Sequence, residues 1–342
     1  MKLMNGMHHG ARVWCLAILV GLTVWGGTSL QAGAAQPVQL TVQGFLQGTT
    51  MHVRAEAVGE LIRKFLGYQV TVKTGAGLSG PIGSMQGKVD LLIAQASYII
   101  NKEAVQKDAP ALAAKYKETL IFPTEEKAEQ LVVLDKVPCS SLAEIFSKKY
   151  PIRIGIGVTQ SRLVAEKIFR TYGVSPKDIE SWGGKVDVTT NPTQIVEYMR
   201  DGFLDAHFIF SGLGSAYIED LGASRKVKML AVAQTDAELK AVQKVLPDFY
   251  RMVLPAKSYR FIEQDVPSVG FSEYLLARPD LPDEIAYNVT KAIWNNTAYL
   301  ISLYPGFDKV LKKERAIELL KIRLEDVHPG AMKYYREIKW LD

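Results

Sequence analysis

The apolar positions along the chain alternate between the spacing of a strand and the spacing of a helix. Apolar and polar residues alternate over 38–42, as in a half-buried strand, and apolar residues recur at helical spacing over 58–65. The same order returns in the second half, with a strand pattern over 152–156 and a helical face over 165–172. This alternation predicts an α/β fold in which a mixed, mostly parallel sheet is flanked by helices.

A short unit occurs twice and predicts two similar lobes. Gly87–Asp90 (GKVD) precedes a buried-looking strand, and Gly202–Asp205 (GFLD) precedes another over 207–210. In each copy the glycine is suited to end a helix in a left-handed cap. Two copies about a hundred residues apart favour a chain of two α/β lobes.

Loops rich in glycine and hydroxyl groups stand at the starts of several predicted helices. The loop Thr74–Gly80 (TGAGLSG) follows a strand over 70–73 and offers backbone N–H groups at the positive end of a helix, which suits a carboxylate. Thr49 and Thr50 stand before the helix over 58–65, either as a second wall of the same anion site or as ordinary helix caps. Thr159 and Ser161 give the second half its own hydroxyl-lined helix start.

The first 35 residues predict a secretory signal peptide. They carry Lys2 and Arg12 and no acidic residue, followed by an apolar run over 13–25 and small residues over 32–35 where cleavage is expected. The apolar run is shorter than the ~20 residues that a membrane-spanning helix needs. Since the segment holds two of the basic residues, its removal lowers the formal net charge from +5 to +3. The chain is therefore expected in the periplasm.

Neither nucleic-acid binding nor a metal or cofactor site is predicted. The basic tract over 309–323 is interrupted by acidic residues, which is typical of a solvated helix face. Three histidines remain after residue 35, at positions 52, 207 and 328, without the spacing of metal ligands. Gly155-x-Gly157 lacks the third glycine of a dinucleotide site. Ser79 and Cys139 have no evident base partner, so no catalytic residue is predicted.

The order of several motifs resembles the TAXI family, the TRAP-associated extracytoplasmic solute receptors. These motifs are the N-terminal segment, Thr74–Gly77, Gly87–Asp90 leading to Gln95, Ser211–Gly214 and His328–Arg336. The resemblance covers essentially the whole chain after residue 35. It implies a type II-like periplasmic binding protein with a hinge and a cleft that closes on a small solute. It also implies delivery of that solute, a carboxylate-containing organic acid or amino acid, to the integral membrane subunits of a TRAP permease.

The resemblance and the loops together give lobe boundaries and a candidate site. We expect residues 36–132 to begin lobe 1, residues 133–267 to form lobe 2, and residues 268–342 to return to lobe 1. The expected ligand-binding residues stand at helix starts and strand ends: Thr49, Thr50, His52, Thr74, Gly75, Ala76, Gly77, Gln95, Thr159, Gln160, Ser161, Phe210, Ser211 and Gly212.

Departures from the family pattern at Met51, His52 and Arg54 leave the ligand class open. Two alternatives to a TRAP-linked receptor remain. One is a receptor that serves an ABC transporter or a sensor, and the other is a secreted hydrolase that uses Ser79 or Cys139.

Overall fold

Strands and helices alternate through residues 37–93, 98–157, 160–189 and 191–342, which are the residues that the computed structural model describes. The predicted signal peptide, Gln95 and Thr159 lie outside them. The strands are β1 (Gln39–Gln43), β2 (Gln69–Lys73), β3 (Leu91–Ile93), β4 (Thr119–Leu134), β5 (Arg153–Gly157), β6 (Lys185–Thr189), β7 (Ala206–Ser211), β8 (Val227–Leu230), β9 (Tyr250–Leu254) and β10 (Val266–Ala277).

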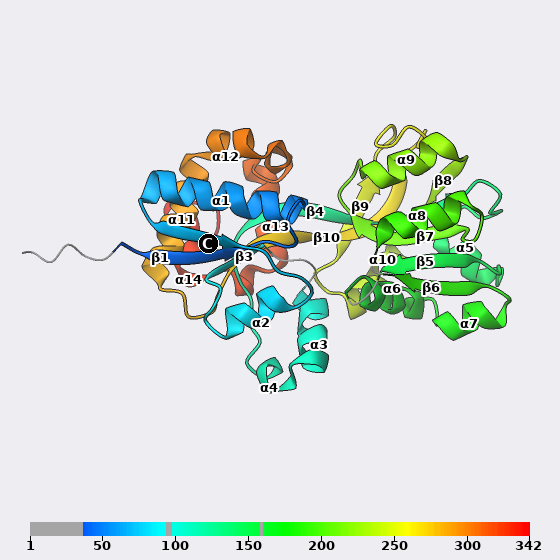
Figure 1. The fold of residues 1–342 in the computed structure, drawn as a ribbon, viewed down its shortest axis with the longest axis horizontal. Helices are drawn as coiled ribbons and strands as arrows, with labels where there is room; N and C mark the ends of the chain where they lie inside the picture. The colour runs from blue at the N-terminus through cyan, green and yellow to red at the C-terminus, as the bar shows by residue number, and fades with distance from the viewer. Residues whose placement is uncertain (1–36, 94–97, 158–159, 190) are drawn as a thin grey trace, which may run out of the picture. The chain divides into compact units, whose positions relative to one another are not determined.

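The helices lie on both faces of these strands (Figure 1). They are α1 (Thr50–Leu66), α2 (Ser79–Met85), α3 (Tyr98–Asp108), α4 (Pro110–Ala113), α5 (Leu142–Ser147), α6 (Gln160–Thr171), α7 (Pro176–Ser181), α8 (Pro192–Arg200), α9 (Ala216–Ser224), α10 (Asp236–Val245), α11 (Asp283–Asn295), α12 (Thr297–Leu303), α13 (Lys313–Ile322) and α14 (Pro329–Glu337), with the 3₁₀ helices η1 (Pro305–Lys309) and η2 (Leu324–Asp326).

One mixed sheet joins all the described strands, in the order β2-β1-β3-β10-β4-β7-β5-β6, with β8 paired to β4 and β9 paired to β10. The long strands β4 and β10 run antiparallel to each other through its middle. On one side of them lie the parallel strands β1, β2 and β3, and on the other lie the parallel strands β5, β6 and β7. This confirms the predicted α/β class with two lobes, which we call lobe 1 (β1–β3 and their helices) and lobe 2 (β5–β9 and their helices).

Each lobe buries its own apolar side chains. In lobe 1, α1 lays Val58, Leu61 and Ile62 onto a core that includes Val42 of β1 and Val289 of α11. In lobe 2, both faces of the sheet are covered, so that its strands are buried on two sides. Continuous apolar burial of this kind is typical of parallel strands with helices on both faces. The apolar residues whose spacing predicted α1 and α6 are therefore those that pack against these cores.

The repeated G-x-x-D unit has a structural role in both lobes. Gly87 and Gly202 have φ angles of 68° and 81°, in the left-handed region that glycine adopts most readily. The carboxylate of Asp90 accepts from the backbone N–H of Thr41 in β1 at 2.7 Å. Asp205 accepts in the same way from Arg153 at the start of β5, at 3.2 Å. Each aspartate stands immediately before a strand and thus ties the start of that strand to its parallel neighbour.

Candidate functional site

In each lobe, the strand next to the two long strands ends at the same part of the sheet. These strands are β3 in lobe 1 and β7 in lobe 2. In β3, Ile93 lies opposite Leu275 of β10, so β3 runs toward lower numbers of β10 and ends near Glu273. In β7, Ser211 lies opposite Ala128 of β4, so β7 runs toward lower numbers of β4 and ends near Lys127. Because Glu273 pairs with Glu125 of β4, both strand ends meet the same charged stretch of β4 and β10. Ligands of open α/β sheets bind outside the carboxyl ends of strands, which makes this stretch the candidate site.

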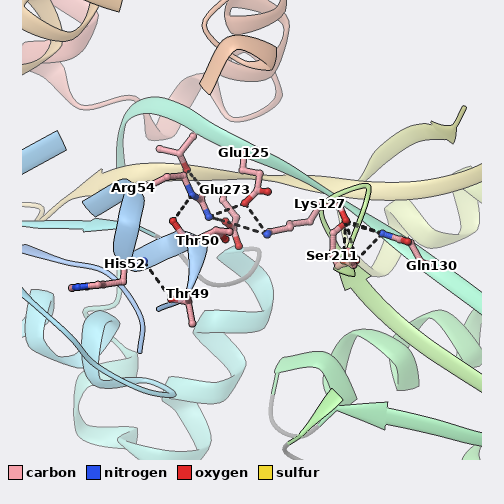
Figure 2. Close-up of polar contacts among 12 residues, drawn as sticks. Thr49, Thr50, His52, Arg54, Glu125, Lys127, Gln130, Ser211 and Glu273 are labelled. Atoms are coloured by element: carbon pink, nitrogen blue, oxygen red, sulfur yellow. Dashed lines mark hydrogen bonds and ion pairs between the residues drawn. The ribbon is translucent and has the colours of Figure 1, made fainter. Parts of the chain in front are cut away.

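A buried cluster of ions occupies this stretch. Arg54, from the second turn of α1, places its guanidinium 2.6 Å from Glu273 and 2.8 Å from Glu125. Lys127 lies 2.7 Å from Glu125 and 4.0 Å from Glu273. Figure 2 shows Arg54 and Lys127 reaching the two carboxylates from opposite sides. Two cations and two anions therefore balance one another where α1, β4 and β10 meet.

The cluster keeps its cations charged. Burial alone would lower the pKa of Arg54, but Glu273 and Glu125 outweigh burial, so the net pKa is raised. The pKa of Lys127 is raised for the same reason, against the opposing effect of burial. Arg54 also donates to the Thr124 hydroxyl at 2.9 Å and to the Thr50 carbonyl at 3.3 Å. With its partners distributed over both long strands, Arg54 fixes the first turn of α1 against the sheet.

The predicted residues at the start of α1 act as a helix cap. Thr49 is the N-cap, and its hydroxyl accepts from the backbone N–H of His52 at 3.3 Å and donates to the Leu46 carbonyl at 2.7 Å. His52 is half-buried, and its Nε2 lies 3.9 Å from Glu56. Its Nδ1 is buried without a hydrogen-bond partner among the described residues. Of the two interpretations of Thr49, ordinary capping is thus realised in the structure.

The predicted glycine loop of lobe 1 encloses a cavity of about 10 Å³, which has room for no more than about one water molecule. Gly75 and Gly77 line it together with Gln43, Met51 and Ser79. Gln43 donates to the Ser79 hydroxyl at 3.0 Å. A Cβ atom on Gly75 would lie 2.0 Å from Nε2 of Gln43, so a larger residue would displace this pair. Thr74 and Ala76 are exposed on the same loop.

The predicted residues of lobe 2 divide between a polar network and an aromatic contact. Ser211 accepts from the amide of Gln130 at 2.7 Å, and the hydroxyl of Tyr259 donates to the oxygen of that amide at 2.7 Å. Phe210 instead packs edge-on against Phe271, with ring centroids 5.3 Å apart. Gln160 opens α6, where its Nε2 is buried without a partner among the described residues. Ser161, next to it, is half-buried against Gly157 at the end of β5.

A second cavity, of about 180 Å³, reaches the ion cluster. Its lining includes Gly212 from lobe 2, Tyr304 and Lys309 from lobe 1, and Glu125 and Glu126 of β4. A Cβ atom on Gly212 would lie 2.7 Å from the Glu125 carboxylate, so the absence of a side chain lets β7 end directly on the cluster. The structure thus brings Gly212 to the cluster. Among the described residues, no hydrogen bond joins the predicted residues of lobe 1 to those of lobe 2.

The ion cluster was not predicted from the sequence. Its residues were visible as a charged run over 125–129 between apolar residues at 120–122 and 131–134. Apolar residues on both sides of a short charged run were the available signal of one continuous strand. Arg54 was singled out as a departure from the family pattern, but its pairing with Glu273 gave no signal, because the two residues lie 219 positions apart in sequence.

The residues considered for catalysis lack the surroundings of a nucleophile. Cys139 is buried, and burial, followed by the charge of Glu144, raises the pKa of its thiol. Ser79 accepts its hydrogen bond from an amide, and an amide is no base. Among the described residues, no group of three or more histidine, cysteine or acidic side chains could hold a metal ion.

Comparison with known proteins gives a family and a fold. A model of the NMT1-like family matches residues 47–338 of the chain. The crystal structure of a TctC solute binding protein from Polaromonas, without ligand, is 15% identical and covers 88% of this chain and 99% of its own, with a TM-score of 0.52. The structure of PhnD1 from Prochlorococcus marinus, in complex with methylphosphonate, is 13% identical. It covers 85% of this chain and 100% of its own, with a TM-score of 0.50. At these identities the two structures establish the shared fold.

Proposed function

The chain belongs to the NMT1-like family, and we propose that it is an extracytoplasmic receptor that captures a small carboxylate-containing solute between its two lobes. The observation that carries this proposal is the register of the sheet, which directs the ends of β3 and β7 at one charged stretch of β4 and β10. Two lobes joined by two long strands can hinge there. Closure would surround a solute with donors from both sides.

The loops beside this stretch suit an anion. Glu273 and Glu125 balance Arg54 and Lys127 at the meeting point, so the donors for an anion are the hydroxyl and backbone N–H groups of the loops of lobe 1. Hydrogen bonds to a charged group are stronger than those between neutral groups, and more so where water is excluded. Methylphosphonate, the ligand of the PhnD1 structure, is also a small anion. For this chain we propose an organic acid or an amino acid.

The finer parts of the proposal follow from the resemblance to the TAXI family. The receptor would be secreted to the periplasm by cleavage of residues 1–35 and would deliver its solute to a TRAP permease. Lobe 1 would comprise residues 36–132 and 268–342, and lobe 2 residues 133–267. None of the helices that the structure describes is long and apolar enough to cross a membrane. A neighbouring gene for a large multi-span TRAP permease would distinguish this partner from an ABC transporter.

A thermal-shift screen of the chain from residue 36 tests the receptor function. The panel contains dicarboxylates, keto acids, hydroxy acids and amino acids, with neutral sugars as the comparison class. A solute present at 100 times its Kd stabilises the folded state by about 2.7 kcal/mol, which raises the melting temperature measurably. We expect at least one acid to do so and to give a saturable isotherm by calorimetry. A folded protein that responds to no acid would refute the carboxylate receptor.

Substitution of Thr74 by Val is expected to weaken binding of the acid found in that screen about tenfold. The change removes an exposed hydroxyl from the anion-holding loop, and a hydrogen bond to a charged group is worth about 1.5–3 kcal/mol. The fold should be unaffected, since Thr74 is exposed. Thr71→Val is the matched control, because Thr71 is an exposed residue three positions earlier on β2. An unchanged Kd in the Thr74 variant, measured by calorimetry, would remove this loop from the site.

A further inference from the structure

Glu129, the third acid on β4 after Glu125 and Glu126, has no counter-charge among the described residues. Glu129 has 1% of its surface exposed, and its Oε1 is buried without a hydrogen-bond partner among the described residues. Burial raises the pKa of this carboxyl well above its usual range, and no neighbouring charge opposes that effect. The ion cluster two residues away is already balanced, so Glu129 stands outside it. A buried polar group without a partner destabilises the fold.

Glu129 lies where the core of lobe 2 meets the candidate site. It pairs with Phe210 of β7, one residue before β7 ends at Ser211. Side chains that lie directly opposite one another share a face of the sheet. Phe210 contacts Phe271, which pairs with Lys127, so Glu129, Phe210 and Lys127 all belong to one face. Glu129 therefore lies on the same face as the cluster, at the edge where the strands of lobe 2 end.

An unpartnered donor is found at the same edge. Gln160 begins α6 directly after β5, and β5 is the neighbour of β7 in the sheet. Its Nε2 is buried without an acceptor among the described residues. An acid without a donor and an amide without an acceptor at one strand edge are complementary to a solute that carries both kinds of group. Functional sites often contain polar groups that are unpaired in the free protein and bind the ligand. Such groups lower the stability of the free protein.

We propose that Glu129 is a specificity-determining residue that accepts a hydrogen bond from an N–H or O–H group of the solute, an inference that rests on the proposed function. The preferred cargo is then an acid that also carries an amino or hydroxyl group. An acid without a second polar group would leave Glu129 buried and unpaired in the complex, and so would bind more weakly. The carbon chain of the solute, between its carboxylate and its amino or hydroxyl group, would pack against Phe210 and Phe271.

Matched pairs of solutes test this assignment. The pairs are malate against succinate and glutamate against glutarate, which differ only in the hydroxyl or amino group. Calorimetry on the wild-type chain should show at least about tenfold tighter binding of the donor-bearing member of a bound pair. Glu129→Met should reduce this ratio to about one, because methionine offers no comparable acceptor. Glu129→Gln should keep part of the preference through its amide oxygen.

The variants also separate recognition from folding. Glu129→Met should melt at the same temperature as the wild type or higher, since an unpaired buried acid is removed, and Glu180→Met on the exposed surface of α7 controls for the substitution itself. If Glu129→Met binds the acids as tightly as the wild type and keeps the same ratio of affinities within a pair, Glu129 has no role in specificity. The receptor function would still stand. Failure of the wild type to bind any acid would overturn the receptor function, and this inference with it.

Discussion

Replacing Arg54 with Met is expected to lower the free energy of unfolding by about 3–5 kcal/mol, the usual loss when one partner of a buried ion pair is removed. Arg54 has no exposed surface and contacts both Glu273 and Glu125. Its loss would leave two carboxylates in a buried place with Lys127 as the one described cation within ion-pair distance of both. Methionine fills a similar volume, so the cost arises from charge rather than from a cavity.

Denaturant unfolding at neutral pH measures this effect, with Arg63→Met as the matched control. Arg63 lies on the same helix, but its side chain is 37% exposed, and its ion pairs are with the exposed Glu56 and Glu60. It also donates to the Val70 carbonyl at 3.3 Å. Exposed pairs are worth about 0–1 kcal/mol, so the control should change stability little. The double variant Arg54→Met with Glu273→Gln should recover part of the loss by removing one uncompensated charge. A cost below about 1 kcal/mol for Arg54→Met would show that water reaches the cluster.

The same cluster explains where prediction from the sequence succeeded and where it failed. The strand over 38–42 and the helical faces over 58–65 and 165–172 were visible because each has one apolar face that meets a core. The spacing of apolar residues within a short stretch of sequence is enough to show such a face. In contrast, the apolar run over 131–134 indicates only a short strand, whereas β4 begins at Thr119. Its charged half is buried because of partners in α1 and β10, and such distant pairings leave no local pattern.

The loops at the strand ends were predictable from the sequence, and the polar groups that lie within the strands were not. Glycine and hydroxyl residues at helix starts correctly marked the ends of strands, because those ends need left-handed turns and helix caps. Because every helix start needs such residues, their presence does not distinguish a ligand site from an ordinary cap. Thr49, for example, caps α1. Gln43, Lys127 and Glu129 carry the polar groups of the candidate site, yet each stands inside a strand pattern. Only the register of the sheet brings them together.

A loss of stability in mild acid is expected from His207, and it forms the second large effect. His207 is fully buried in β7, and neither ring nitrogen has a hydrogen-bond partner among the described residues. Burial lowers its pKa from 6.5 to about 3. The neutral ring is therefore favoured by folding, so this stabilisation is complete above pH 6.5 and is lost as the pH falls toward 3. Between pH 6.5 and 4.5 the loss amounts to about 2.3 kcal/mol.

Two other groups modify this slope in opposite directions. Burial also lowers the pKa of His328, which caps α14, so His328 adds to the loss in acid. Glu129 acts the other way. Its pKa is raised by burial, so its contribution is most favourable below its unfolded pKa and declines as the pH rises through its folded pKa. Acidification therefore partly offsets, through Glu129, what it removes through the two histidines.

Denaturant unfolding of His207→Leu between pH 7 and pH 4.5 separates these contributions. Leucine fits the apolar surroundings and does not titrate, so between pH 7 and pH 4.5 the variant should lose about 2.5 kcal/mol less stability than the wild type. Glu129→Gln should show the reverse, a steeper loss than the wild type, because its compensating proton uptake is gone. Since Glu129 pairs with β7, the strand that carries His207, opposite changes of slope cannot come from general weakening of this part of the sheet. Parallel slopes for the wild type and His207→Leu would mean that the imidazole finds a proton acceptor or water when it is charged.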